Sequence, residues 1–283
     1  MYSNKLYTPL RYPGGKARFA PLVTEIIQKN DLGGGHYLEP YAGGAGLALI
    51  LLMDQVVEHI HINDFDPAVA AFWRAAVNDG ERLIELVANA DVTMEAWHHW
   101  RAVMQGKTPA GGLERGFATL FMNRTNRSGI LKGGVIGGKD QAGVYKLDAR
   151  FMRDKICNRL QLIHDKRDFI HVYEEDAISL LRRCATVVPK KTLVYLDPPY
   201  YVKGAGLYRN SYKHEDHSEI ADFLKTGELG LPWITSYDNA TEIREMYANE
   251  TSVTYGLNYT AQRRYVGDEV MFFSDELSHV PVS

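Results

Sequence analysis

The segment Leu196-Asp197-Pro198-Pro199-Tyr200 combines an acid, two prolines and an aromatic ring in an arrangement that suits chemistry on an amine. The prolines fix the backbone and remove two N–H groups, so the Pro198 carbonyl is left as an acceptor beside the Asp197 carboxylate. A primary aromatic amine such as adenine N6 can donate one hydrogen to each, which pushes electron density onto its nitrogen. Tyr200 would stack on a base rotated out of a duplex. We therefore predict that Asp197, Pro198 and Tyr200 are catalytic.

A glycine-rich segment, Glu39-Pro40-Tyr41-Ala42-Gly43-Gly44-Ala45-Gly46, joins a predicted strand over residues 36–40 to a predicted helix over 47–53. Backbone at such a turn passes close to a ligand, although short loops also need glycine for structural reasons. Asp64 lies twenty residues after Gly44, at the end of the next predicted strand, where it can accept hydrogen bonds from a ribose. The glycines do not match GxGxxG, and Glu39 suits a positively charged cofactor. The turn therefore favours S-adenosylmethionine (AdoMet) over NAD.

A third motif, Arg11-Tyr12-Pro13-Gly14-Gly15-Lys16, is by itself only a glycine turn before a helix. Pro21 is expected at the first position (N1) of that helix. Asp66 is expected to cap the helix that Pro67 begins. Further strands are predicted at 59–62, 169–173, 193–196, 233–235, 252–255 and 269–273. Strands alternating with helices imply a largely parallel sheet covered on both faces.

The strand signal fades between about residues 77 and 167, where helix signals dominate. Lys and Arg outnumber Asp and Glu from residue 101 to 167, as expected where a phosphate backbone binds. Residues 128–145 hold several glycines, which favours a hairpin or a mobile loop. This stretch is therefore predicted to be a separate, mainly helical module.

With 283 residues, 45% hydrophobic and 24% charged, the chain is long enough for one large α/β core and a second module. It lacks the run of about 20 apolar residues that a membrane span requires. It also lacks an apolar signal-peptide core, so a cytoplasmic location is expected, in a bacterial cytosol or a phage-infected cell. Cys157 and Cys184 form no CxxC pair, and we predict no metal site.

Four motifs in series resemble those of the Dam-type, alpha-group (D12 class) DNA N6-adenine methyltransferases. They are Arg11–Lys16, Glu39–Gly46, the segment Phe121-Met-Asn-Arg-Thr-Asn-Arg-Ser-Gly129, and Leu196–Tyr200. The resemblance implies an α/β, Rossmann-like AdoMet-dependent methyltransferase fold with an inserted, mainly helical target recognition domain. We expect the catalytic domain over 1–76 and 168–283, and the recognition domain with its Gly-rich hairpin over 77–167.

The resemblance also implies which residues bind AdoMet. Tyr12 and Lys16 would line the pocket, Glu39, Ala42 and Gly43 would lie against the methionine part, and Asp64 would bind the ribose. Asp176 is similar to the family acid that meets the adenine ring, and Asp197 would contact the cofactor as well as the base. Cofactor residues expected on this basis are Tyr12, Lys16, Glu39, Ala42, Gly43, Asp64, Asp176 and Asp197.

Residues 123–129 are similar to the family segment that enters DNA and contacts bases, since arginine can fork onto guanine and asparagine onto adenine. The DNA-binding residues expected here are Asn123, Arg124, Asn126, Arg127, Lys132 and Lys139. The glycine-rich residues 130–139 depart from the pattern of the GATC methylases, so the target sequence stays open. Residues 236–239 and 258–262 fall where the family has loops near the flipped base.

The predicted reaction is site-specific methylation of adenine N6 in double-stranded DNA, by base flipping and direct transfer from AdoMet. No Cys lies near the predicted site, which excludes a cytosine-C5 mechanism that needs a thiolate. The alternatives are a cytosine-N4 or RNA adenine methyltransferase and a catalytically silent DNA-binding regulator. A cognate restriction enzyme is a candidate partner, and a monomer or weak dimer is expected.

Overall fold

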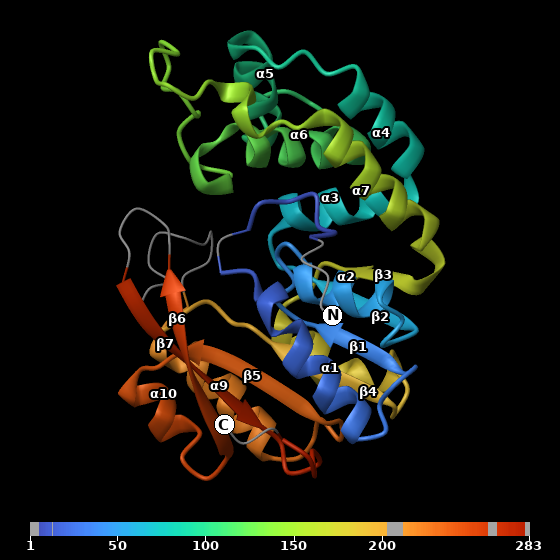
Figure 1. Ribbon diagram of the computed structural model, residues 1–283, viewed down its shortest axis with the longest axis vertical. Helices are drawn as coiled ribbons and strands as arrows, with labels where there is room; N and C mark the ends of the chain where they lie inside the picture. The colour runs from blue at the N-terminus through green and yellow to red at the C-terminus, as the bar shows by residue number, and fades with distance from the viewer. Residues whose placement is uncertain (1–5, 13, 203–211, 260–264, 281–283) are drawn as a thin grey trace. The chain divides into compact units, whose positions relative to one another are not determined.

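The computed structural model describes residues 6–12, 14–202, 212–259 and 265–280 (Figure 1). These residues form a seven-stranded sheet in the order β3-β2-β1-β4-β5-β7-β6. Its strands are β1 (His36–Glu39), β2 (His59–Asn63), β3 (Ile170–Tyr173), β4 (Thr192–Leu196), β5 (Trp233–Asp238), β6 (Thr251–Tyr259) and β7 (Tyr265–Phe273). β1 pairs in parallel with β2 and β4, and β4 pairs in parallel with β5. β7 pairs antiparallel with β5 and β6, which the largely parallel pattern did not specify.

The predicted strands all form, and their hydrophobic patterns explain why. Every residue of β4 and β5 is buried, as expected for central strands of a sheet covered on both faces. Further helices lie outside residues 64–174. They are α1 (Ala20–Lys29), α2 (Gly46–Met53), α8 (Ala177–Arg183), α9 (His214–Lys225) and α10 (Thr241–Met246), with short 3-10 helices at Lys16–Phe19 and Cys184–Thr186. Pro21 is the second residue of α1, one position later than predicted, and lies in the first turn of the helix.

Residues 64–174 are mainly helical. Their helices are α3 (Pro67–Asn78), α4 (Gly80–Ala88), α5 (Met94–Met104), α6 (Gly112–Thr125) and α7 (Arg153–Asp165), with 3-10 turns at Arg127–Gly129, Leu147–Arg150 and Arg167–Phe169. Asp66 caps α3 as predicted, since its carboxylate accepts the N–H of Ala68. α6 packs closely on α3, because a Cβ at Gly116 would lie 2.6 Å from that of Ala75.

The chain divides into two compact units whose bounds differ from the predicted domains. Unit 1, here called the helical unit, holds residues 1–18, 43–50 and 64–174, and unit 2, the sheet unit, holds 19–42, 51–63 and 175–283. The helical unit therefore includes the Arg11–Lys16 motif and α3 in addition to the predicted module. The reason is packing: the α3 backbone carbonyl of Ala68 accepts a hydrogen bond from Thr119 of α6 at 3.0 Å. The division at 76 and 167 stays a prediction.

Candidate active site

Asp197 follows β4 directly, at the carboxyl edge of the parallel strands. Because Leu196 pairs with Thr235, Asp197 lies beside Ser236 of β5. The Ser236 hydroxyl donates to Asp197 Oδ1 at 3.1 Å and orients this carboxylate. Pro198 is buried, while Asp197 keeps partial exposure. The predicted acceptor pair thus sits at the edge where open α/β sheets bind ligands.

Tyr200 is tied to a buried acid on β7. Its hydroxyl donates to Glu269 Oε1 at 2.5 Å, and Glu269 is fully buried whereas Tyr200 is 7% exposed. The sequence analysis did not identify Glu269 as a functional residue. An acid directly before the apolar run 270–273 was the signal that could have revealed it.

Asp238 holds the chain just after Tyr200. Its two carboxylate oxygens accept the backbone N–H groups of Tyr201 at 2.8 Å and Val202 at 3.0 Å. Asp238 also lies directly opposite Glu269 in the β5–β7 pairing. Two buried acids on neighbouring strands therefore position the segment that follows Asp197. Asp238 falls in the predicted loop 236–239, whereas the other predicted loop lies outside the described residues at 260–262, and the side chains at 258 and 259 are not described.

Glu39 is a buried acid at the end of β1, only 6% exposed. The Tyr37 hydroxyl donates to Glu39 Oε1 at 3.0 Å. Burial, followed by the nearby Glu39 charge, raises the pKa of Tyr37 well above its ordinary value, so the phenol stays a donor. The arrangement keeps a carboxylate at the same sheet edge as Asp197, because β1 and β4 are parallel neighbours.

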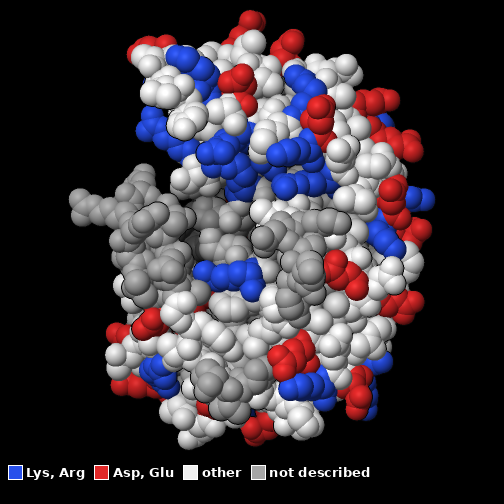
Figure 2. Space-filling model, in the orientation of Figure 1, with Lys and Arg blue, Asp and Glu red and all other residues white. Residues whose placement is uncertain are grey.

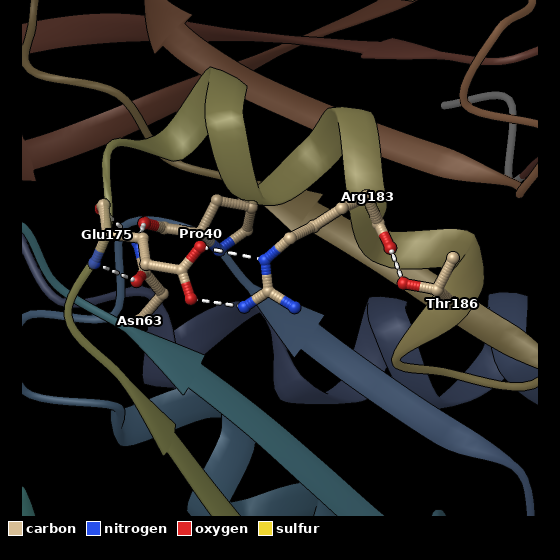
Figure 3. A network of polar contacts seen from close by, with 5 residues as sticks. All are labelled: Pro40, Asn63, Glu175, Arg183 and Thr186. Atoms are coloured by element: carbon tan, nitrogen blue, oxygen red, sulfur yellow. Dashed lines mark hydrogen bonds and ion pairs between the residues drawn. The ribbon is translucent and has the colours of Figure 1, made fainter.

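A buried amide links three loops at this edge (Figure 3). Asn63 donates to the carbonyls of Pro40 at 2.9 Å and Glu175 at 3.0 Å, and it accepts the Glu175 N–H at 2.9 Å. The Glu175 side chain is held in turn by both nitrogens of an Arg183 fork. These contacts explain how the β1–α2 turn and the β3–α8 turn keep fixed conformations.

Within the helical unit, the carboxylate of Asp64 accepts the N–H of Gly43 at 2.9 Å and that of Asp66 at 2.8 Å. Burial raises the pKa of Asp64 to about 7, although these two N–H donors act in the opposite direction. Trp73 Nε1 donates to the Gly43 carbonyl at 2.9 Å. Gly43 has φ +47°, which favours glycine, and the predicted ribose acid is therefore built into the glycine turn.

Tyr12 packs directly on that turn. A Cβ added at Gly43 would lie 2.6 Å from Tyr12 Cε1, and one at Gly44 would lie 2.9 Å from Tyr12 Cβ. The predicted Lys16 and Ala42 are buried, at 5% and 8% exposure. The chain crosses from the sheet unit to the helical unit between Ala42 and Gly43. The structure thus explains the two glycines by their close approach to an aromatic ring.

Asp176 caps α8. Its Oδ1 accepts the backbone N–H of Ser179 at 2.9 Å and the Ser179 hydroxyl at 3.1 Å, and the residue is exposed. One carboxylate oxygen is thus used by the helix, which leaves the other for a ligand. The prediction that Asp176 meets the adenine ring stays a prediction.

The predicted DNA-binding residues divide into two groups. Asn123, Arg124 and Asn126 are 2%, 3% and 0% exposed. Asn123 donates to the Gly129 carbonyl at 2.8 Å, and Arg124 donates to the Pro9 carbonyl. The Asn126 Oδ1 accepts from Trp97 Nε1 at 2.8 Å. In this conformation all three are interior residues, because α6 ends inside the packed unit, and their contact with bases stays a prediction.

Arg127, Lys132 and Lys139 are exposed, and they are the members of the predicted set that face solvent. Figure 2 shows Lys and Arg side chains gathered over the surface that the helical unit forms. This distribution agrees with the basic excess that the sequence shows there.

Among the described residues, no group of three or more His, Cys, Asp and Glu has a geometry suited to a metal ion. No helix in the described part of the chain combines the length and apolar composition needed to cross a membrane.

A mostly parallel seven-stranded sheet with Asp-Pro-Pro-Tyr at its carboxyl edge defines a Rossmann-like methyltransferase. The model of the D12 class N6 adenine-specific DNA methyltransferase family matches residues 12–261, so the chain belongs to this family. The family resemblance, the fold class and the adenine-specific DNA methyltransferase activity expected from the sequence are thereby confirmed. DNA is the substrate, and a methyl donor is required.

Two curated proteins are similar to this chain. The Type II methyltransferase M.MjaIII of Methanocaldococcus jannaschii is 24% identical over 208 residues, which cover 68% of each chain. The Retron Ec67 DNA adenine methylase of Escherichia coli is 20% identical over 268 residues, covering 92% of this chain and 85% of the relative. The second similarity extends over both compact units.

Proposed function

We propose that this adenine-specific DNA methyltransferase uses AdoMet and transfers its methyl group directly to a flipped adenine. The observation that carries the proposal is the acceptor pair at the carboxyl edge of β4, where Ser236 orients the Asp197 carboxylate beside the buried Pro198. AdoMet supplies a methyl carbon activated by its sulfonium. The protein residues supply binding, orientation and acceptors for the amine protons.

In this proposal Asp197 and the Pro198 carbonyl accept the two N6 hydrogens, which keeps the nitrogen lone pair directed at the methyl carbon. AdoMet would supply the methyl group and leave as S-adenosylhomocysteine, and the Asp197 carboxylate is an acceptor for the proton that the methylated amine would lose. Tyr200, fixed through Glu269, stacks on the base. Rotation of the base out of the duplex costs a few kcal/mol, which contacts with the backbone and the pocket offset.

The residues present fit a cation with an adenosine moiety. Glu39 is a buried acid with a fixed donor, and Asp64 is an acceptor held at a glycine turn. We propose that Glu39, Ala42 and Gly43 bind the methionine part and that Asp64 binds the ribose. Tyr12, Lys16, Asp176 and Asp197 complete the proposed set.

We assign DNA phosphate and base contacts to the exposed Arg127, Lys132 and Lys139, which lie in the stretch 101–167 where Lys and Arg outnumber Asp and Glu. In this proposal Asn123, Arg124 and Asn126 stabilise the fold of the helical unit, because their side chains are buried in it. The proposed context is a cytoplasmic enzyme that acts as a monomer or weak dimer at one short site, with a cognate restriction enzyme as a candidate partner.

Incubation of the purified chain with AdoMet and unmethylated duplex DNA tests the proposal. Nucleoside mass spectrometry should show N6-methyladenine, and modification-sensitive sequencing should place it at one short motif. The Asp197→Ala variant is the control and should form no product. N4-methylcytosine, or methylation of RNA alone, would replace the proposed substrate, and AdoMet binding without any methylation would indicate a silent DNA-binding regulator.

A further inference from the structure

The backbone segment 8–12 is fastened to the end of α6 by Asn123. The amide oxygen of Asn123 accepts the Arg11 N–H at 2.7 Å, and its nitrogen donates to the Arg11 carbonyl at 2.9 Å. The same nitrogen donates to the Gly129 carbonyl at 2.8 Å. A single interior side chain therefore pairs with Arg11 on both of its backbone groups, as a neighbouring strand would.

Guanidinium groups of the helical unit hold the residues just before Arg11. Arg124 donates to the Pro9 carbonyl, and Arg159 donates to the Thr8 carbonyl at 2.8 Å. Burial, followed by the nearby charges of Arg159 and Arg11, lowers the pKa of Arg124 to about 10. Three like charges are thus kept together at a cost in free energy. Because packing alone does not require charges there, their arrangement indicates a role for the segment that they hold.

Gly129 permits the close approach of this segment. It has φ +76°, and a Cβ at this position would lie 2.2 Å from the Arg11 carbonyl oxygen. Any larger residue would push Arg11 away from Asn123. Asn123, Arg124 and Gly129 of the expected DNA-reading motif are therefore explained by contacts with residues 8–11.

The other end of the segment is the aromatic ring against the glycine turn. Tyr12 lies on Gly43 and Gly44, and the Gly43 N–H donates to Asp64. A shift of Tyr12 would open space over Gly43, whose N–H is one of the two backbone donors that hold the Asp64 carboxylate. The contacts thus run without a gap from α6 to the proposed ribose acid, all within one compact unit.

We propose that Asn123, Arg124 and Arg159 are positioning residues for the methyl donor, acting through residues 8–12, which hold Tyr12 on the Gly43–Gly44 turn. The inference rests on the proposed function, in which this turn binds AdoMet. Residues 8–12 also link α6, in the predicted recognition domain, to the glycine turn that is proposed to bind AdoMet. By thermodynamic reciprocity, any effect of bound DNA on AdoMet affinity through this segment is matched by an equal effect of AdoMet on DNA affinity.

The test is calorimetric binding of AdoMet and of S-adenosylhomocysteine to the full chain in the absence of DNA. Asn123→Ala is expected to weaken both by about tenfold or more, and Arg159→Met by severalfold. The matched controls are Asn89→Ala and Arg82→Met, which remove exposed side chains of α4 or its C-terminal cap in the same unit. Both controls should bind within about twofold of the parent chain. Thermal unfolding of each variant confirms that it is folded.

DNA affinity for cognate and scrambled duplexes, measured by fluorescence anisotropy, separates the two interpretations of Asn123. If Asn123→Ala loses discrimination between duplexes but binds AdoMet like the parent chain, the residue reads bases and the positioning role is rejected. If that variant does not fold, the less buried Arg159→Met decides, and unchanged AdoMet affinity rejects the role. Failure of the parent chain itself to bind AdoMet would reject the proposed cofactor. That outcome differs from the one that rejects only the positioning role, in which the parent chain and the variants bind AdoMet equally well.

Discussion

The carboxylate of Asp64 accepts the backbone N–H of Gly43 at 2.9 Å, which joins the end of one strand to the glycine turn after another. Burial raises the pKa of this carboxyl to about 7 even with that donor in place. The proposed ribose acceptor therefore titrates in the range where enzymes are assayed.

We expect AdoMet affinity to rise with pH up to about 8. The raised pKa means that Asp64 carries a proton at pH 6, and hydrogen bonding to ribose hydroxyls favours the ionised form. Affinity should therefore change by up to about tenfold per pH unit below 7 and level off above it. Calorimetry at pH 6, 7 and 8 in buffers of different ionisation enthalpy measures both the affinity and the proton released. Asp64→Asn should bind more weakly with a flat pH profile, and a flat profile in the parent chain would contradict the assignment.

Removal of the Tyr200 hydroxyl should lower both stability and kcat. Tyr200→Phe leaves the buried Glu269 without this donor, at an expected cost of about 1–3 kcal/mol in the free energy of unfolding. Glu269→Gln keeps an acceptor and should cost less. Urea denaturation and steady-state kinetics of both single variants and the double variant give the coupling energy. Strictly additive effects would show that the 2.5 Å contact does not contribute to catalysis.

His217 should make the protein sensitive to acid. Its fully buried ring lies 5.3 Å from the ring centroid of Tyr201 and 5.5 Å from those of Tyr212 and Tyr237. Burial lowers its pKa to about 4. Because the unfolded chain takes up this proton near pH 6.5, stability is lost as pH falls from about 6.5 towards 4, by roughly 2–3 kcal/mol at pH 4.5.

The variant that isolates this effect is His217→Phe, which keeps a ring of similar shape. Urea denaturation at pH 7 and 4.5 should show a smaller difference between the two pH values for the variant than for the parent chain. An equal difference in both proteins would assign the acid sensitivity to other groups.

Asn63→Ala should destabilise the chain by about 2–3 kcal/mol, because it removes the partners of the Pro40 carbonyl and of both Glu175 backbone groups. The exposed Asn158 provides the matched control, whose change to Ala should stay within about 0.5 kcal/mol. Denaturant unfolding measures both. We also expect weaker AdoMet binding by Asn63→Ala, since Pro40 and Glu175 adjoin the proposed cofactor turns, and unchanged stability would show that the amide network is dispensable.

Much of the fold was predictable from the sequence because the signals are local. The apolar runs at Leu193–Leu196 and around Ile60 specify buried strands, and the pair Asp66-Pro67 specifies where α3 begins. Asp197, Pro198 and Tyr200 could be predicted as catalytic because their side chains and backbone share one short segment. Local chemistry of this kind does not depend on what the distant chain contributes.

The sequence by itself thus determined the element order and the family, and it predicted the acceptor pair, since each follows from adjacent residues. Only the tertiary structure decided which distant residues contact these motifs. Glu269 meets Tyr200, and Asn123 meets Arg11, through contacts between residues 69 and 112 positions apart. The type of a polar residue does not reveal whether it will face solvent or an unsatisfied backbone group. The burial of Asn123, Arg124 and Asn126 is therefore decided by packing, because interior backbone groups require partners that only the folded chain can bring to them.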